Sequence, residues 1–423
     1  MKSSIPLAAG TGSSVVVTHC QVCDSTDLER VLFLGYLPPV NQMRPQGSTP
    51  REQPAYPALL LRCTKCQLAQ LGLVVDPAIL FPPEYPYSSG TTKILRENFA
   101  ELYTDCQSVV KLKPTDLVVD VGSNDGTLLI NFKNGGHRVF GVEPSDMGKV
   151  AIEKGIPSLI SFFGPEAAAT VREEQGRATI VTATNVFAHI ENVHEIVASV
   201  IDMLDDKGVF ISESHYLLSL VETLQYDTVY HEHLRYYSLH SLQYLLGMHG
   251  LEVVRVKRIP THGGSVRVYS ARRGAYPVDA SVKAALQAEI DFGLLDGSVF
   301  AKFKKRVTKS KLDIMRLLGE LKAQGKNIVG IGAPSRASTL ISYLGIDDGI
   351  LDAVLEVPGS YKIGKYMPGT LIPVVDEGML FRDAPDCALL LSWHIADELI
   401  PKLRAKGYKG QFIVPLPDAR IVE

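Results

Sequence analysis

Residues 228–238 read TVYHEHLRYYS and bring together side chains that can move protons. Tyr230, His231, Glu232 and His233 place a phenol, two imidazoles and a carboxylate in four consecutive positions. Histidine has an ordinary pKa near neutrality, so an imidazole here suits a general base, and a neighbouring carboxylate or phenol could assist it. The segment therefore indicates acid–base catalysis, although a polar loop that caps helices and packs aromatic rings could have the same composition.

Two cysteine pairs have the spacing of metal ligands. Cys20 and Cys23 enclose two residues, as do Cys63 and Cys66. A C-x-x-C pair lets a tight turn present two sulfurs, and two such pairs complete the tetrahedral shell that zinc prefers. Four thiolates leave no open position for water, so the spacing predicts a structural zinc ion.

A third group of residues could hold a small-molecule cofactor. The stretch LVVDVGSNDGTLL reads as a strand, a glycine turn and the start of a helix, with Gly122, Asn124, Asp125 and Gly126 in the turn. The turn lacks the G-x-G-x-x-G pattern that binds a pyrophosphate, and its acidic character suits a cationic ligand.

Two later strand ends complete this prediction. Glu143 ends the next apolar stretch, where a carboxylate can accept hydrogen bonds from both ribose hydroxyls of an adenosine. Asn185 and His189 follow the strand-like ATIVTAT, and we expect them at the same edge of the sheet. Together with the turn, these residues are typical of the S-adenosylmethionine site of class I methyltransferases, although a doubly wound fold without ligand would share each feature.

The elements that must position these residues follow from the alternation of apolar strands and amphipathic helices. Such alternation predicts a parallel sheet covered by helices on both faces. A second strand–glycine turn–helix unit, GIGAPSRASTL, opens another α/β pattern near the C-terminus. We therefore predict an α/β protein with three parts, namely a disordered leader and zinc-binding module (1–75), a central domain (76–310) and a smaller Rossmann-like domain (311–423).

Composition narrows the functional class. Of the 423 residues, 46% are hydrophobic and 21% are charged, and the formal net charge is −3. A nucleic-acid-binding protein would usually carry a basic face, so we expect no nucleic-acid partner. No stretch approaches the roughly 18 consecutive apolar residues of a membrane span, and the first residues lack the pattern of a signal peptide. We expect a cytoplasmic protein without a membrane partner.

The motifs in order resemble one family, the S-adenosylmethionine-dependent C-methyltransferases that act on nucleotide-linked keto-deoxysugars in antibiotic pathways. The series runs from the two C-x-x-C pairs through EYPYSSGTT, DVGSNDGTLL, GVEPS, NVFAHI, YHEH, THGGSVR and GIGAPSRASTL to GKYMPGT. The resemblance covers nearly the whole chain. It implies a zinc-binding module, a class I methyltransferase domain and a C-terminal α/β domain that helps to hold the nucleotide-sugar, with a dTDP-linked substrate favoured.

The resemblance also assigns roles to particular residues. It makes His233 the catalytic base, with Tyr230, Glu232 and His189 as assistants. It places Tyr85 or Tyr87 over the active site, and the sequence does not choose between them. The THGGS and GIGAPS loops can offer backbone N–H groups or charge to a phosphate. These loops supply the predicted substrate-binding residues His262, Gly263, Gly264 and Arg336.

The chemistry implied for this family explains the crowded YHEH segment. A sugar carbon becomes acidic only beside a carbonyl, so a base must remove the C3 proton next to a C4 ketone before that carbon can accept a methyl group. The phenol of Tyr230, or the ring N–H of His189, could donate a hydrogen bond to the developing enolate oxygen, a contribution worth about 3–4 kcal/mol in other enzymes.

Two other functional classes fit parts of the sequence. GIGAPS could bind a nicotinamide cofactor and make the protein an oxidoreductase, but the motif lacks a third glycine and no acidic residue downstream is compelling. A non-catalytic protein that binds partners through its zinc module is the third reading. The oligomeric state stays open.

Overall fold

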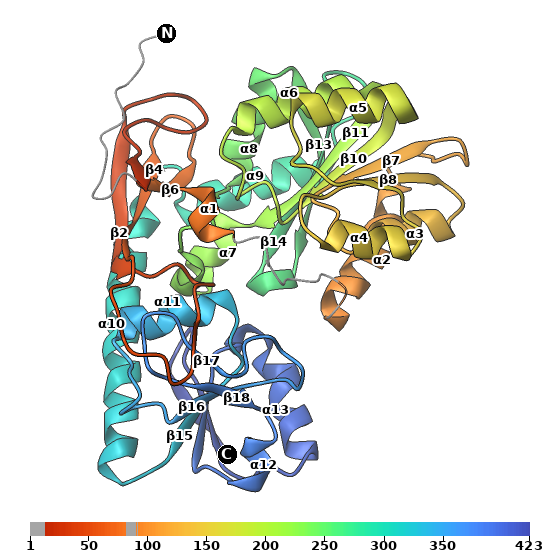
Figure 1. The fold of residues 1–423 in the computed structure, drawn as a ribbon. Coiled ribbons are helices and arrows are strands. Elements are labelled where there is room, and N and C mark those ends of the chain that lie inside the picture. The colour runs from red at the N-terminus through yellow and green to blue at the C-terminus, as the bar shows by residue number, and fades with distance from the viewer. Residues whose placement is uncertain (1–12, 82–89, 91) are drawn as a thin grey trace.

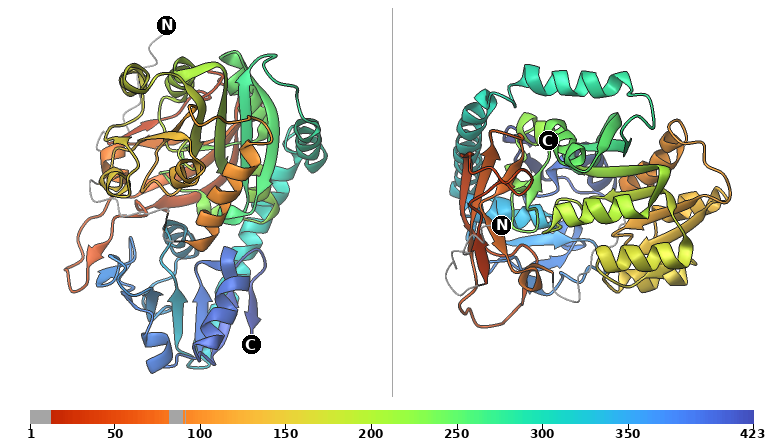
Figure 2. Two further views of the ribbon diagram at one scale, coloured as in Figure 1. Left: turned by 90° about the vertical axis from the view of Figure 1, so that its right-hand side faces the viewer. Right: turned by 90° about the horizontal axis from the view of Figure 1, so that it is seen from above.

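The computed structural model describes residues 13–81, 90 and 92–423. Three sheet-bearing parts follow one another along the chain, and Figure 1 shows the N-terminal module and the C-terminal domain on adjoining sides of the central domain. The left view of Figure 2 shows the blue C-terminal sheet below the central domain. In the described part of the chain, no helix combines the length and the apolar character needed to cross a membrane.

The central domain is built on a seven-stranded sheet in the order β13-β14-β11-β10-β7-β8-β9. Its strands are parallel except β14, which runs antiparallel to both neighbours. The strands are β7 (Leu117–Val121), β8 (Arg138–Val142), β9 (Ser158–Leu159), β10 (Ala178–Thr184), β11 (Leu204–His215), β13 (Leu251–Ile259) and β14 (Ser265–Arg272). The predicted doubly wound sheet is therefore present, with β13 and β14 completing one edge.

Helices cover both faces of this sheet because side chains alternate along each strand. Val119 faces the apolar cluster that contains α5 and α6, whereas Val118 faces the cluster that contains α2 and α3. The helices of this part are α2 (Lys93–Cys106), α3 (Leu129–Asn134), α4 (Met147–Glu153), α5 (Pro165–Gln175), α6 (Val193–Met203), α7 (Leu217–Glu222), α8 (Leu239–Met248) and α9 (Ala280–Phe292), with short 3₁₀ turns η2 (Tyr226–Thr228) and η3 (Thr261–Gly263).

A buried ion pair fixes the carboxyl end of β11. Glu213 and Arg267 face each other across β11 and β14, and neither side chain is exposed. Nε of Arg267 donates to Glu213 at 2.5 Å, and the amide of Asn98 on α2 donates to the other carboxylate oxygen at 2.9 Å. Removing one partner of such a pair would leave a buried charge uncompensated, so the network holds this strand end firmly.

The N-terminal module contains a four-stranded antiparallel sheet in the order β12-β5-β4-β2. Its strand β12 comes from the segment just after YHEH, more than 150 residues beyond the other three strands. The elements are β1 (Ser14–Val16), β2 (Leu28–Leu37), β3 (Arg44–Pro45), β4 (Tyr56–Cys63), β5 (Ala69–Leu71), β6 (Leu73–Val75), α1 (Pro77–Leu80) and β12 (Arg235–Tyr236). The module is thus completed by a strand from the segment that follows YHEH.

The C-terminal domain has a six-stranded sheet in the order β18-β16-β15-β19-β20-β21, parallel except for the terminal β21. Its strands are β15 (Ile328–Ile331), β16 (Ala353–Glu356), β17 (Lys365–Tyr366, paired with β3), β18 (Val374–Asp376), β19 (Cys387–Leu390), β20 (Gln411–Val414) and β21 (Arg420–Val422). Its helices are α11 (Ser335–Leu344), α12 (Met379–Arg382), η4 (Trp393–Ile395) and α13 (Ala396–Ala405).

The long helix α10 (Ser298–Ala323) connects the central and C-terminal domains. The sequence boundary expected between residues 310 and 311 falls inside this continuous helix. Its buried side chains recur at helical spacing while its lysines face outward, as the sequence pattern predicts. The buried residues are Phe300, Phe303, Val307, Ser310, Ile314, Leu318 and Leu321.

Candidate active site

The four paired cysteines converge on one point in the N-terminal module. Their sulfur atoms all lie within 4.8 Å of one another, with 3.4 Å between Cys20 and Cys66 and between Cys23 and Cys63. A tetrahedral zinc ion with Zn–S bonds of about 2.3 Å needs sulfurs at this kind of separation. All six cysteines lie in the described part of the chain and are free thiols, so these sulfurs are available as ligands. The donor set and its spacing therefore fit a structural zinc ion.

The zinc cluster is close in sequence to the support of the YHEH loop. β5 begins three residues after Cys66 and pairs with β12. The backbone N–H of Leu71 donates to the carbonyl of Leu234 at 3.0 Å, and the N–H of Leu234 donates to Ala188 at 2.9 Å. The YHEH loop is therefore clamped between the zinc module and the carboxyl end of β10. The metal site can therefore influence the position of the YHEH loop.

Gly122 and Gly126 have backbone conformations that the cofactor turn requires. Their φ angles are +71° and +77°, in the left-handed region that favours glycine. A Cβ atom on Gly122 would lie 2.8 Å from Val186, so the turn also needs the small residue for close packing. Asn124 adopts a positive φ of 49° in the same turn, a strained conformation that is common at ligand sites.

Glu143 lies at the end of β8, beside this turn, as predicted. It is 7% exposed, and its carboxylate accepts hydrogen bonds from the backbone N–H of Asn124 at 3.0 Å and from the N–H and hydroxyl of Ser145 at 2.9 and 2.6 Å. These donors fix the carboxylate at the switch point of the sheet, where such folds bind nucleosides. Oε1 already accepts both bonds from Ser145, whereas Oε2 accepts only that from Asn124 and keeps a second acceptor position for a ribose hydroxyl.

The other two predicted cofactor residues have different surroundings. Asp125 accepts hydrogen bonds from Thr127 and Gly90 and forms an ion pair with Lys154 at 3.0 Å. Its contacts therefore hold the turn. Asn185 follows β10 with a positive φ of 58°. Among the described residues, its buried Oδ1 atom has no hydrogen-bond partner. An unsatisfied acceptor in a strained residue at the carboxyl edge of the sheet is consistent with a ligand contact.

Replacing Glu143 by glutamine should weaken S-adenosylmethionine binding by about 10- to 100-fold, the effect of losing a hydrogen bond to a charged group. The glutamine amide would also turn a donor toward the N–H of Asn124 or of Ser145. Calorimetry measures the change in Kd. Asp146→Asn is the matched control because that exposed carboxylate pairs only locally with Lys149. Unchanged affinity in Glu143→Gln would remove Glu143 from the cofactor site.

The carboxyl edge of the central sheet carries a cluster of buried imidazoles. The ring of His233 lies 4.9 Å from His189 and 5.1 Å from His215, and His215 lies 5.6 Å from His262. These four residues come from four segments, namely the ends of β10 and β11, the YHEH loop and η3. The structure thus brings together His189, His233 and His262, as the sequence predictions require, and adds His215.

His233 has a defined protonation state. Its Nδ1 lies 2.9 Å from the carbonyl oxygen of Thr228, and a carbonyl only accepts hydrogen bonds, so Nδ1 carries the proton. Nε2 of the neutral ring then presents a lone pair. Burial, and next the repulsion of a second positive charge on His189, lowers the pKa of His233 to about 3. The pKa of His233 therefore differs from the near-neutral value expected from the sequence, because the ring is buried among other imidazoles.

The neighbours of His233 occupy distinct positions. The ring centre of Tyr230 lies 4.3 Å from that of His233. Nδ1 of His189 donates to the backbone carbonyl of Glu232 at 2.7 Å, and burial lowers the pKa of His189 to about 4. The Nδ1–H of the neutral His189 ring is therefore engaged in holding the loop. Tyr230 is the better candidate for a donor to an enolate oxygen.

The THGGS loop packs against the segment that precedes YHEH. Gly263 has a φ of +86°, and a Cβ atom there would lie 2.3 Å from the side chain of Gln225. The amide of Gln225 donates to the carbonyl of Gly263 at 2.6 Å, and the N–H of Tyr216 donates to Gly264. His262 also has a positive φ, of 55°. Close packing therefore explains both glycines, and their contact with a phosphate stays a prediction.

Arg336 is buried and paired within the protein. Its guanidinium donates to both carboxylate oxygens of Asp227 at 2.8 Å and lies 4.8 Å above the ring centre of Trp393. The indole N–H of Trp393 donates to the same carboxylate at 2.7 Å. This cluster joins the C-terminal domain to η2, just before the catalytic loop. The predicted contact of Arg336 with a substrate anion would have to compete with Asp227.

The GIGAPS turn has an acidic partner that the sequence reading undervalued. Glu356 ends β16 and accepts a hydrogen bond from the N–H of Ala333 at 2.9 Å. This repeats the contact between Glu143 and Asn124 in the central domain. The two positions are equivalent because each carboxylate ends the strand next to a glycine turn. The carboxylate became recognisable only when the strand order placed β16 beside β15.

Three observations complete the site. Tyr85 and Tyr87 lie outside the described residues. The sequence analysis missed His215, although it is the last residue of β11 and so belongs at the carboxyl edge of the sheet. It also missed Asn41, whose amide nitrogen lies 2.7 Å from the carboxylate of Glu232. Asn41 belongs to no recognisable sequence motif.

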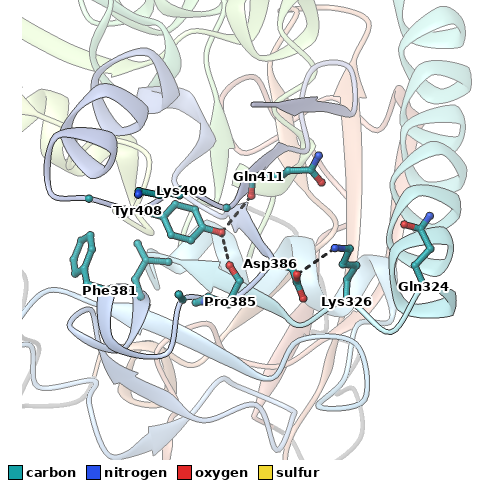
Figure 3. A pocket seen from close by; sticks show the side chains of 12 residues that line it. Gln324, Lys326, Phe381, Pro385, Asp386, Tyr408, Lys409 and Gln411 are labelled. Carbon is teal, nitrogen blue, oxygen red and sulfur yellow. Dashed lines mark hydrogen bonds and ion pairs between the residues drawn. The ribbon is translucent and has the colours of Figure 1, made fainter.

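A cavity of about 480 Å³ lies at the amino ends of the C-terminal strands, away from the GIGAPS turn (Figure 3). It is lined by Lys326 and Asp386, which form an ion pair at 3.2 Å, and by Tyr408 and Gln411. Lys326, Asp386 and Gln411 lie at the amino ends of β15, β19 and β20. Ligands of such sheets bind outside the carboxyl ends of the strands, so this cavity is not the active site.

The fold and the cofactor turn define a class I methyltransferase, and comparisons with known proteins agree. Family models match a zinc binding domain at residues 20–81, a methyltransferase domain at 94–256 and a C-methyltransferase C-terminal domain at 260–417. The chain is 31% identical over 409 residues to C-methyltransferase NovU of Streptomyces niveus, covering 96% of this chain and 97% of the relative. It therefore belongs to the C-methyltransferase family and is an S-adenosylmethionine-dependent C-methyltransferase with a structural zinc site.

Solved structures give only partial matches. Magnesium protoporphyrin IX methyltransferase of Synechocystis PCC 6803 with bound SAM is 16% identical, with a TM-score of 0.33 over 42% of this chain and 79% of that one. The plantazolicin methyltransferase BpumL in complex with SAH is 12% identical, with a TM-score of 0.37 over 47% of this chain and 93% of that one.

Proposed function

We propose that this protein methylates the carbon next to the ketone, most simply C3, of a nucleotide-linked 4-keto-deoxyhexose, with His233 as the base. The observation that carries the proposal is the protonation geometry of His233. The carbonyl of Thr228 holds the proton on Nδ1, so the buried Nε2 can only accept one. A neutral, buried imidazole is suited to removing a proton from carbon.

The residues of the chain would divide the reaction as follows. Nε2 of His233 takes the proton, and the electron pair of the broken C–H bond moves into the enolate. The phenol of Tyr230 stabilises the enolate oxygen by donating a hydrogen bond. The carboxylate of Glu232 accepts a hydrogen bond from a sugar hydroxyl and so orients the ring. Bound S-adenosylmethionine supplies an electrophilic methyl group, and Glu143, Asn185 and the turn at Gly122 would hold it.

The substrate class rests on the family and on the architecture. The C-terminal domain adds a second strand–turn–helix unit whose turn and Glu356 face the same interface as Glu232. A small ketone would need no second nucleotide-binding fold, whereas a nucleotide-sugar would. A dTDP-linked sugar is the substrate we favour. Free thiols and a thiolate zinc site fit a reducing compartment, so we place the reaction in the cytoplasm.

Mass spectrometry of reactions with a panel of nucleotide-linked keto-sugars tests this function. We expect one added methyl group on carbon, and only with sugars that carry a ketone beside a C–H bond. The matching sugar in which the ketone is reduced to an alcohol is the negative control. Methylation of the reduced sugar, or a methyl group on oxygen, would contradict the enolate route.

A further inference from the structure

Asn41 of the zinc module reaches into the active site of the central domain. It lies in the connection between β2 and β3, and its Nδ2 atom donates to Oε1 of Glu232 at 2.7 Å. Glu232 is only 2% exposed. A hydrogen bond from an amide to a buried carboxylate stabilises the ionised form and limits its rotation.

The orientation of the Asn41 amide follows from its neighbours. A carboxylate oxygen only accepts, so the amide nitrogen must face Glu232 and the amide oxygen must face away. That oxygen lies 3.4 Å from the hydroxyl of Ser335, at the start of α11. A single side chain of the zinc module thus contacts both the catalytic loop and the C-terminal domain.

The backbone around Asn41 is anchored by other contacts. β3 pairs with β17, and the amide of Gln46 donates to the carbonyl of Val374 at 3.0 Å. The amide of Gln42 donates to the carbonyl of Ile79 at 3.1 Å, within the module itself. The loop therefore keeps its place without the side chain of Asn41, so substitution there should leave the fold intact.

We propose that Asn41 is a positioning residue of the active site, which holds the Glu232 carboxylate in one orientation for the substrate. The inference rests on the proposed function, because Glu232 acts there on the sugar. It gives the zinc module a second task besides supporting β12, namely to supply a side chain at the point where the three parts of the protein meet.

Other charged groups also bear on Glu232. Tyr361 and Lys362 of the C-terminal domain interact electrostatically with Glu232, and both also interact with Glu356. The N–H of His189 is bound to the backbone of Glu232 and not to its carboxylate. Asn41 therefore differs from these groups because it is a neutral donor at 2.7 Å. Asn41→Asp changes its charge but not its size, and so tests this contact.

The test compares Asn41→Ala and Asn41→Asp with the control Gln42→Ala. Two rates are measured for each variant. One is methyl transfer, and the other is solvent-deuterium exchange at the substrate carbon with S-adenosylhomocysteine in place of the methyl donor. Asn41→Ala should lower kcat by about 10- to 100-fold, as expected for a lost hydrogen bond to a charged group, with unchanged cofactor affinity and Tm. In Asn41→Asp two carboxylates at hydrogen-bond distance must share a proton, so the acid limb of kcat/KM should move to higher pH. Gln42→Ala removes one anchor of the same loop but leaves the Asn41 amide in place, so it should lower kcat less than Asn41→Ala does and should not move the acid limb.

Each outcome decides the inference. Exchange by Asn41→Ala at the wild-type rate, or a pH profile of Asn41→Asp that matches Asn41→Ala, would refute the role of Asn41 and leave the proposed function intact. Absence of exchange and methyl transfer in the wild-type enzyme across the sugar panel would overturn both. A reduced rate in Asn41→Ala with the displaced acid limb in Asn41→Asp supports both.

Discussion

His233→Asn should lose methyl transfer by about 10²- to 10⁴-fold, the usual contribution of a general base, while S-adenosylmethionine binds as in the wild type. The asparagine amide can still donate to the carbonyl of Thr228, as Nδ1 of His233 does, so the loop should keep its conformation. It offers no basic nitrogen to the substrate. Single-turnover kinetics measures the loss, and calorimetry measures cofactor affinity.

His231→Asn is the matched control for this variant. His231 is two positions earlier in the same buried loop, but its Nε2 faces the carbonyl of Pro57 at 3.3 Å, on the side of the zinc module. We expect His231→Asn to retain most of the activity. Near-normal turnover in His233→Asn would show that another group removes the proton.

The pH dependence of kcat/KM is a second test of His233 as the proposed base. Burial lowers the pKa of His233 to about 3, from an ordinary value of 6.5. His233, the proposed base, is therefore already neutral throughout the range in which an exposed histidine would titrate. The profile of kcat/KM should show no fall in activity near pH 6.5 from protonation of this residue. A limb at that pH that disappears in His233→Asn would contradict the buried, neutral state.

The fold was predictable because its signals are local. The two C-x-x-C pairs specify a zinc cluster, and apolar stretches such as LVVDV and CALLL specify buried parallel strands, whatever surrounds them. Gly122 and Gly126 were recognisable since a positive φ restricts the residue type. Glu143 was found by its spacing from that turn. Each of these inferences needs only a short window of sequence.

The rest of the site depends on contacts between distant segments. Asn41 and Glu232 are separated by 191 positions, and Arg336 and Asp227 by 109. Sequence patterns do not report such pairs without an alignment. The tautomer of His233 depends on the carbonyl of Thr228, which a list of side chains does not contain. The sequence therefore supplied candidates for the reacting groups but not the partners that set their charge and direction.

Removal of zinc should disable catalysis more strongly than cofactor binding. Structural zinc sites supply a large share of the folding free energy of small modules, about 10–16 kcal/mol in zinc-finger peptides. The module here is the partner of β12 and the source of Asn41, whereas the cofactor turn at Gly122 lies in the central sheet. Loss of the metal should free the YHEH loop, and a displacement of about 1 Å at a reacting group can cost 10²-fold in rate.

The double replacement Cys63→Ser and Cys66→Ser tests this expectation alongside chelation of the wild-type enzyme. We expect at least a 10²-fold loss of methyl transfer, a size consistent with a misplaced base, together with a new unfolding transition at lower temperature. Affinity for S-adenosylmethionine should change little. Cys387→Ala is the control, because that buried cysteine lies in β19, far along the chain from the cluster. Full activity after complete removal of zinc would show that β5 holds the catalytic loop without the metal, and would separate the zinc site from catalysis altogether.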